Sequence, residues 1–586
     1  MTNDQSNRSS ILTMKIWHLI LVAVLGFSFF AGCGSVIRRG QSPDDSLLRL
    51  NEKNGVTTFI GDTCGVKGVR PGRIEGIGLA VGLEGTGSEP APSGQKDYLL
   101  RELKNNKSTE NARKALASDN TSMIMVRGLI PAGAKKGDRI DLQVTAPPKS
   151  KTTSLKYAEL LKTDLRPMAF LSRSVKLGNV FGFAKGPILV DSLFEASTDD
   201  QHNLRGVILG GGVLKDDYPL SLVVRSEESK VKVTRSIAHS LNERYTTSTP
   251  GGIENTAKPI TDRIVEILVP DEYEHNLGRF IQAIQAMAVN ESEAGLAKRL
   301  DDLDRRISEV DTSQRAAIEL EAIGQLGVPI LKRAMSHPDF EVRFYVAEAL
   351  AYLGHGDGIE HLSLAAETEP AFRWHALTAL ASLGNTEATV ALRQMFDLPS
   401  AETRYGAFRA LQAASPSDRS IQGKLLSEEF YLHDITSDAD GMIHFSRTKR
   451  PEIVVFGNQK VSKDFIFVQP GITVRAIDKD RASIVRFDPL DGKIKLTCST
   501  EIAELIKSLS RFGLDYTTIL EMCQEADSND TLNARLVINA APRIGSKSIR
   551  DSVVSGEKSE KYVTQTAPDL FADVQTDGPE DSDALE

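Results

Sequence analysis

Three alanine-rich segments recur in the middle of the chain at intervals of about 30 residues, and this repeat restricts the fold more than any other feature. The segments span 341–354, 371–384 and 403–414, and each has an arginine at the same position, namely Arg343, Arg373 and Arg404. Small alanines with leucine on one face let paired helices pack closely, and Gly354 and Gly384 end the first two copies. Because one helix pair cannot bury its own apolar face, such units stack side by side. We therefore expect a short α-solenoid at 291–425.

These units resemble the HEAT-repeat family, with about three or four copies visible in this chain. The usual role of such a solenoid is to present a surface to a partner protein. The resemblance therefore implies a partner-binding surface in this part of the chain.

The N-terminal region reads as an export signal. Residues 14–33 contain one lysine, one histidine and an apolar run of about a dozen residues, which is short for a bilayer span but suits a secretory signal. The closing sequence FAGC at 30–33 resembles the lipobox of bacterial lipoproteins, in which the signal is cut before the cysteine and the cysteine is acylated. The resemblance implies lipidation at Cys33. An ordinary cleaved signal or a short membrane anchor is the alternative, and Met1 and Met14 are both candidate starts.

Charge and aromatic content exclude one broad class of function. Lys and Arg number 70 against 79 Asp and Glu, a net charge of −9, and aromatic residues make up 6% of the chain. A general nucleic-acid binder normally has a basic excess, and a platform for single strands needs stacking aromatics. We therefore expect no nucleic-acid partner.

The cysteines indicate neither a dense disulfide framework nor a metal site. Besides Cys33 the chain has Cys64, Cys498 and Cys523, which are far apart in sequence. Three cysteines cannot all pair with one another. A Cys498–Cys523 bridge and buried free thiols both stay open.

A glycine-dense stretch at 74–88, IEGIGLAVGLEGTGS, looks at first like a phosphate-binding loop. Its glycines are Gly76, Gly78, Gly82, Gly85 and Gly87. Gly82 and Gly87 have P-loop spacing, but Ser88 stands where the phosphate-binding lysine is needed. In the dinucleotide pattern G-x-G-x-x-G the third glycine would fall at Val81 or Pro90. We therefore predict no nucleotide cofactor, and a strand whose small residues permit close backbone packing before a Gly-Thr-Gly turn.

Other candidate sites fail similar tests. The linker HGDGIEH at 355–361 has two histidines and an aspartate, which a turn and a helix start explain more simply than a metal site. The sequence DADG at 438–441 resembles part of a calcium loop, but Thr436 and Arg447 stand at positions that require acidic ligands. The G-x-S-x-G motif of serine hydrolases is absent, and no nucleophile can be paired with a base. The sequence predicts no enzyme, no metal site and no cofactor.

Hydrophobic patterns predict a mixed fold on both sides of the repeats. Between 57 and 290 we expect strands at 74–83, 122–129, 139–146, 188–190, 220–224 and 263–269, and helices at 233–244 and 275–288. Between 426 and 545 we expect strands at 453–456, 465–468 and 534–539, a hairpin pairing 484–487 with 493–496 through a turn at 488–492, and helices at 501–512 and 516–526. The final residues, 567–586, have seven acidic side chains and no Lys or Arg, which predicts disorder.

Several motifs together resemble the flagellar basal-body P-ring protein family. The first block begins with GVKGVR and the glycine stretch and continues through SMIMVRGLIPAGAKKGDRIDLQV. Its motifs lie in order at 65–70, 74–87, 122–144, 183–190, 205–212, 233–245 and 263–270. A second block follows the repeats, with motifs at 452–461, 468–474, 499–523 and 534–538. The likeness covers about 320 residues, so the helical repeats read as an insertion into one loop of the family frame.

The resemblance implies a structural, non-enzymatic protein of α+β multidomain fold, with Gly-rich mixed β/α ring-building domains interrupted by the α-solenoid. Expected parts are a lipoprotein signal at 1–33, a tether at 34–56, an N-terminal ring part at 57–290, the repeats at 291–425, a C-terminal α/β domain at 426–545 and an acidic tail at 546–586. Subunits of the family assemble in the periplasm into a homo-oligomeric ring around the flagellar rod, near the peptidoglycan.

Two features depart from the family pattern, namely the lipobox and the repeats. A lipid at Cys33 implies attachment to a membrane, expected to be the outer one, in addition to rod and outer-ring partners. The alternative is an envelope lipoprotein outside the flagellum that uses the ring fold and the repeats as a protein-binding module.

Overall fold

The computed structural model describes residues 57–105, 111–148, 150–171, 174–194, 200–249, 252–488, 492–543 and 570–571. The predicted signal, Cys33 and the tether lie outside these ranges. Within them, no helix combines the length and hydropathy that crossing a membrane requires. Helices and several separate sheets are both present, which confirms the α+β multidomain class.

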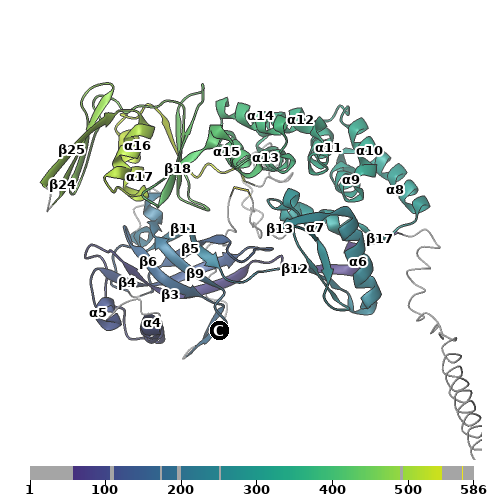
Figure 1. Cartoon of the computed structure of the whole chain (residues 1–586), viewed down its shortest axis with the longest axis horizontal. Helices are drawn as coiled ribbons and strands as arrows, with labels where there is room; N and C mark the ends of the chain where they lie inside the picture. The colour runs from purple at the N-terminus through teal and green to yellow at the C-terminus, as the bar shows by residue number, and fades with distance from the viewer. Residues whose placement is uncertain are drawn as a thin grey trace, which may run out of the picture. The chain divides into compact units, whose positions relative to one another are not determined.

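A sheet that closes on itself dominates the N-terminal part (Figure 1). Its strands are β3 (Gly72–Val81), β4 (Thr121–Ile130), β5 (Arg139–Thr145), β6 (Glu159–Leu165), β9 (Gly182–Pro187) and β11 (Arg205–Leu214). They run antiparallel in the order β11-β5-β4-β3-β6-β9, and β9 pairs back onto β11. We call this the closed sheet. The short β10 (Leu189–Val190) extends it beside β11.

Strand β3 is buried on both faces, which explains its unbroken apolar run. Ile74 and Ala80 belong to the inner core of the closed sheet. Ile77 and Leu79 alternate with them and pack outward against α4 (Gly94–Asn105) and α5 (Ala112–Leu116). The prediction of a strand at 74–83 is confirmed, with a shift of two residues at each end.

A second, four-stranded sheet has the antiparallel order β15-β16-β12-β2. Its strands are β15 (Ala257–Pro259), β16 (Ile264–Ile267), β12 (Leu220–Val224) and β2 (Cys64–Lys67), and α6 (Val231–Arg244) packs against it. The other elements of this part are α3 (Ile60–Thr63), α7 (Leu277–Gln285), η4 (Asp271–Tyr273), β1 (Thr58–Phe59), β17 (Ala288–Asn290), and the hairpins β7 (Met168–Leu171) with β8 (Ser174–Leu177) and β13 (Thr246–Thr249) with β14 (Gly252–Asn255). The predicted strands at 220–224 and 263–269 and both predicted helices are present.

Helices alone occupy the stretch that contains the repeats (Figure 1). They are α8 (Glu293–Arg306), α9 (Val310–Ile323), α10 (Val328–Ala334), α11 (Phe340–Tyr352), α12 (Ile359–Thr368), α13 (Pro370–Leu383), α14 (Thr386–Gln394) and α15 (Ala401–Ala414). Helices α9, α11, α13 and α15 contact one another in succession, and α10, α12 and α14 lie against them. We call this the helical segment. Gly354 and Gly384, both in the left-handed region, follow α11 and α13, as the sequence predicts.

The C-terminal part contains two sheets and two helices. A mixed sheet has the order β18-β19-β21-β20-β26, formed by β18 (Gly423–Leu426), β19 (Phe430–Ile435), β21 (Glu452–Phe456), β20 (Met442–Phe445) and β26 (Arg535–Ile538). An antiparallel sheet joins β22 (Ile466–Gln469), β23 (Ile472–Ala476), β24 (Arg481–Asp488) and β25 (Gly492–Ser499). Helices α16 (Ile502–Arg511) and α17 (Tyr516–Ser528) bury their apolar faces here. Every element predicted for 426–545 is present, although part of the predicted turn at 488–492 lies outside the described residues.

Candidate functional site

The glycines of β3 lie where β6 crosses closely. A Cβ added at Gly76 would lie 2.7 Å from the backbone oxygen of Asp164, and one added at Gly78 would lie 2.6 Å from Oγ1 of Thr163. Real Cβ atoms essentially never approach other atoms this closely. A side chain at Gly76 would therefore require the backbone of β6 to move, and one at Gly78 would require the side chains of Leu160 and Thr163 to shift.

The next three glycines shape the turn after β3. Gly82 and Gly85 have φ values of +85° and +77°, which L side chains rarely adopt. A Cβ at Gly87 would lie 2.7 Å from the backbone oxygen of Asp119. A phosphate-binding loop needs free backbone N–H groups. Here the N–H of Gly85 donates to Leu83, that of Gly87 to Asp119 and that of Ser88 to Thr121, each through the backbone carbonyl.

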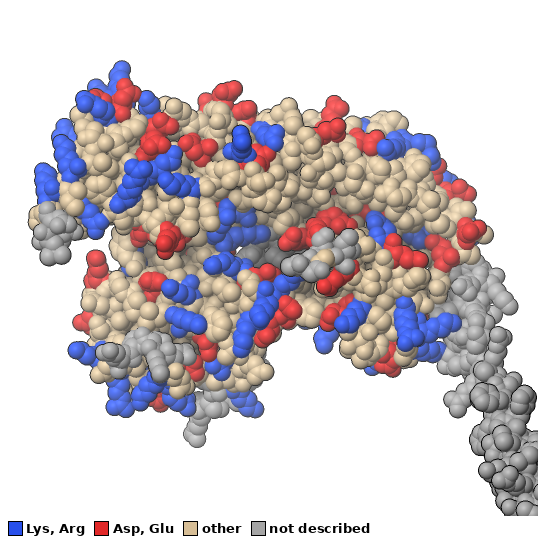
Figure 2. Space-filling view, viewed as in Figure 1, with Lys and Arg blue, Asp and Glu red and all other residues tan. Residues whose placement is uncertain are grey.

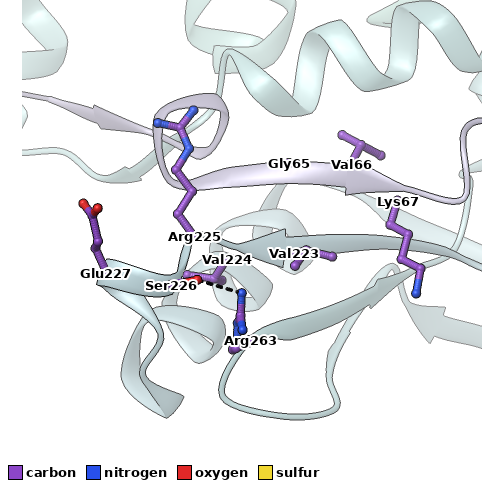
Figure 3. A pocket seen from close by; sticks show the side chains of 9 residues that line it. All are labelled: Gly65, Val66, Lys67, Val223, Val224, Arg225, Ser226, Glu227 and Arg263. Atoms are coloured by element: carbon purple, nitrogen blue, oxygen red, sulfur yellow. Dashed lines mark hydrogen bonds between the residues drawn. The ribbon is translucent and has the colours of Figure 1, made fainter.

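An open pocket of about 650 Å³ lies at one edge of the four-stranded sheet (Figure 3). It is lined by Gly65, Val66, Lys67, Val223, Val224, Arg225, Ser226, Glu227 and Arg263. Arg263 donates from Nη2 to Oγ of Ser226 at 3.1 Å, whereas Arg225 and Lys67 point away in different directions (Figure 3). Small-molecule sites bring polar groups together on one point. Here the cationic side chains outnumber the acidic one and point in different directions, which suits a surface that contacts another protein better than a small-molecule site.

Strand β2 forms the edge beside this pocket. It pairs with β12 from Cys64 to Lys67, and no other strand of the described ranges pairs with its second edge. A Cβ added at Gly65 would meet nothing within 4 Å. The opposite edge, β15, is short and ends at Pro259, two features that block pairing. The two edges of this sheet therefore differ in their capacity to accept a strand from another chain.

A second exposed surface lies on the sheet β22–β25. The pairing register places Ile466, Val468, Val485 and Phe487 on one face together with Arg475, Lys493 and Lys495. The Phe487 side chain is 66% exposed and that of Val468 is 62% exposed. Figure 2 shows Lys and Arg gathered over β24 and β25. A contiguous patch of exposed apolar side chains commonly marks a surface that binds another molecule.

A buried ionic cluster joins the N-terminal part to the helical segment. Arg279 of α7 contacts Glu321 of α9 (Nη2 to Oε2, 2.6 Å) and Glu348 of α11 (Nη1 to Oε2, 2.6 Å). Tyr273 donates to Glu321 at 2.8 Å, and the Arg279 guanidinium stacks over the ring of Tyr352. Burial would raise the pKa of Glu348, but Arg279 outweighs burial and holds that pKa below its ordinary value. We call this group the Arg279 cluster.

A second cluster joins the helical segment to the C-terminal part. Glu452 of β21 accepts hydrogen bonds from Tyr405 (2.9 Å) and Arg409 (3.2 Å) of α15, and from Arg450 (2.9 Å). Burial would raise the pKa of Glu452, but Arg409 and Arg450 lower it to about 2. We call this group the Glu452 cluster. Sequence reasoning missed both clusters, because their members lie tens of residues apart and only the fold brings them together.

The arginine repeated in the three segments has a common contact. Each one donates to a backbone carbonyl at or just after the end of the preceding helix, where carbonyls lack helical partners. Arg343 reaches His337 (2.6 Å), Arg373 reaches Ala366 (3.0 Å) and Arg404 reaches Leu398. The sequence repeat therefore marks a repeated helix–helix junction.

Residues of the weaker candidate site at 355–361 have polar partners within the helical segment. Asp357 pairs with Lys332 at 2.9 Å, and His355 bonds Gln325 at 3.0 Å. Among the described residues, no group of three or more His, Cys, Asp and Glu side chains is arranged to hold a metal ion. Cys64, Cys498 and Cys523 are all free, so the bridge between Cys498 and Cys523 that the sequence left open is not formed.

Comparison with known proteins gives one consistent result. The family model described as "Flagellar P-ring protein" matches residues 60–298. Among curated relatives, the flagellar P-ring protein of Thermotoga maritima is 26% identical over 252 residues, covering 42% of this chain and 70% of the relative. That of Rhodopseudomonas palustris is 27% identical over 306 residues, covering 50% of this chain and 77% of the relative.

The family model matches only part of the chain. The match ends at the sixth residue of α8, so the HEAT likeness of the helical segment and the lipoprotein signal stay predictions. The resemblance to the flagellar P-ring protein family is confirmed by the match of residues 60–298 to the model of that family and by curated relatives that bear its name.

Proposed function

We propose that this chain is a structural subunit of a P-ring-like ring in the basal body of a bacterial flagellum. The family match over residues 60–298 carries the proposal, because it covers the whole closed sheet and the four-stranded sheet. The relatives bear the name flagellar P-ring protein.

Two different surfaces support assembly into a ring. A head-to-tail contact between unlike surfaces makes a ring when the rotation closes. The open edge at β2 and the exposed face of β22–β25 are unlike surfaces of this kind, the first offering unpaired backbone groups and the second apolar and basic side chains. Further partners in this proposal are the rod, the outer ring and the nearby peptidoglycan.

Periplasmic placement and a lipid at Cys33 are part of the same proposal. The support is the sequence FAGC after an apolar run. Acyl chains contribute about 0.8 kcal/mol for each buried CH₂, so a multiply acylated Cys33 would hold the subunit firmly on a membrane, in our proposal the outer one. We propose no catalytic role and no cofactor.

A second candidate function is a non-flagellar envelope lipoprotein that uses the ring fold and the helical segment to bind another protein. The observation that favours it is the helical segment itself, because stacked helical repeats usually present a surface to a partner protein.

Deletion of the gene separates the two candidates. If the chain is a ring subunit, the deletion strain stops swimming in soft agar, and electron micrographs of its basal bodies lack the ring. Complementation with the full chain restores both. Swimming cells whose basal bodies keep every ring would contradict the first candidate. For the anchor, replacement of Cys33 by serine should move the protein from the membrane fraction to the soluble fraction.

A further inference from the structure

Two residues of the acidic C-terminal tail are buried. The sequence predicts disorder for 567–586, and most of the tail lies outside the described residues. Leu570 and Phe571 are described, with exposed fractions of 2% and 0%. A tail without a binding site would not bury two neighbouring apolar side chains in this way.

The residues around this dipeptide come from three elements. Arg409 of α15 donates from Nη2 to the carbonyl of Leu570 at 3.4 Å, and Thr448 of the β20–β21 loop donates from Oγ1 to the carbonyl of Phe571 at 3.2 Å. The ring of Trp374 in α13 meets the Phe571 ring edge-on, with centroids 6.5 Å apart. We call Trp374, Arg409 and Thr448 the socket. Both backbone carbonyls of the dipeptide thus have a donor.

The socket is organised independently of the tail. Its central donor, Arg409, is held by Glu452 of the Glu452 cluster. The Nε atom of Arg409 is buried and has no hydrogen-bond partner among the described residues. A guanidinium already fixed by a carboxylate loses little conformational entropy when it binds a further acceptor.

The path of the chain favours binding within one molecule. Gly406 of α15 lies against Pro542, because an added Cβ would be 2.6 Å from Cγ of that proline. Arg409 follows on the same helix about one turn later. Residues 544–569 therefore connect two points that are close in space, so the dipeptide can bind within its own molecule without a second chain.

The charges of the loop and of the tail also favour binding of the dipeptide at the socket. The loop from Ser446 to Arg450 carries three cationic residues, Arg447, Lys449 and Arg450, whereas the residues around the dipeptide are acidic and include no Lys or Arg from 567 onward. Opposite charges favour the encounter of the tail with this loop.

We propose that the socket is a peptide-binding site whose ligand is this chain's own Leu570–Phe571 dipeptide. Bound in cis, the dipeptide connects the helical segment to the β20–β21 loop of the mixed sheet in the C-terminal part. The ligand class is a short acidic peptide with two neighbouring large apolar side chains. The inference does not depend on the proposed flagellar function.

Tryptophan fluorescence tests the proposal directly. The chain has two tryptophans, so the full chain with Trp17→Phe reports on Trp374 alone. In this background the double variant Leu570→Ser, Phe571→Ser should shift Trp374 emission to longer wavelength and raise its quenching by acrylamide at least twofold. A synthetic peptide of residues 564–577 should reverse both changes saturably in the double variant and have no effect on the parent. Unchanged emission, or no response to the peptide, would overturn the proposal.

Two controls keep the result specific. A peptide with serine at both apolar positions should not reverse the changes; if it does, the recognition of Leu570 and Phe571 is wrong. Thr448→Val, added to the double variant, removes one donor and should weaken the peptide's affinity roughly fivefold, the equivalent of one hydrogen bond.

Photocrosslinking then tests the cis arrangement. With benzoylphenylalanine in place of Phe571 in the full chain, we expect crosslinks to residues near Trp374 within one molecule. Crosslinked dimers formed between differently tagged copies would overturn the cis arrangement.

Discussion

Single glycines decide how closely two strands of the closed sheet approach. Gly78 faces β6, where Leu160 and Thr163 occupy the space that a side chain would need. The glycine density that suggests a ligand loop in the sequence is, at this position, a requirement of strand packing.

Gly78→Ala should lower the free energy of unfolding by about 1–3 kcal/mol, the usual cost of overpacking a filled interior. The added methyl group would collide with Oγ1 of Thr163, 2.6 Å away. Urea unfolding followed by circular dichroism measures the loss. Gly94→Ala is the matched control, since a Cβ there meets nothing within 4 Å. Equal stabilities of the two variants would contradict the steric account.

The roles of some single residues could be predicted from the sequence, whereas those of others could not. Spacing alone excluded a P-loop, because Ser88 stands where lysine is required. The Arg279 cluster could not be foreseen, because Arg279 and its partner Glu321 are separated by a helix end, a strand and α8. Chemistry that depends on long-range contacts leaves no local spacing signal.

At the scale of elements, the repeated arginine works as a connector between successive helices. Arg373 lies in α13 but bonds the last turn of α12, and its Nη1 also pairs with Glu402 of α15 at 2.8 Å. One buried side chain therefore ties three helices together.

Arg373→Ala should lower the free energy of unfolding by about 2–3 kcal/mol, because it leaves the carbonyl of Ala366 without its charged donor. Arg315→Ala is the control: its side chain is exposed and pairs with Glu319 within one helix, so its loss should cost about 0.5 kcal/mol or less. Thermal or urea unfolding of the full chain compares the two. A loss for Arg373→Ala no larger than that for Arg315→Ala would refute the connector role.

Elements with regular patterns were predictable, and irregular ones were not. The helices that carry the alanine repeats and the hairpin β24–β25 have clear periodicity and were foreseen. Strand β11 was missed as a strand, since its consecutive glycines at 210–212 oppose strand propensity. The structure accommodates them with a register shift between Ile208 and Gly212, where Gly210 has a φ of +58°.

For the whole molecule, buried histidines make stability depend on pH. His444 stacks on Tyr405, and its Nε2 accepts a hydrogen bond from the backbone N–H of Ala540 at 3.0 Å. Burial lowers the pKa of His444 to about 3. The unfolded chain therefore takes up this proton near pH 6.5 while the folded chain does not, and stability is lost as the pH falls from about 6.5 towards 3.

His444→Gln should remove about 2 kcal/mol of the stability difference between pH 7 and pH 5, since glutamine does not titrate there. Urea unfolding at the two pH values measures the difference. Other groups act within the same range, because burial raises the pKa of Glu429 to about 7 and opposes the effect. For this reason the variant is compared with the parent chain and with the exposed control His239→Gln. An unaltered difference in His444→Gln would contradict the assignment.

The two ionic clusters have opposite polarity. At its first end the helical segment supplies the carboxylates and the N-terminal part the cation Arg279; at its second end it supplies Arg409, and the C-terminal part the carboxylate of Glu452. Removal of the helical segment would leave the buried cation Arg279 without its carboxylate partners and would take one arginine away from the buried anion Glu452. Each loss would cost several kcal/mol of folding free energy. A chimera that grafts these helices into a P-ring relative therefore needs an arginine at one splice and a glutamate at the other, transplanted along with them.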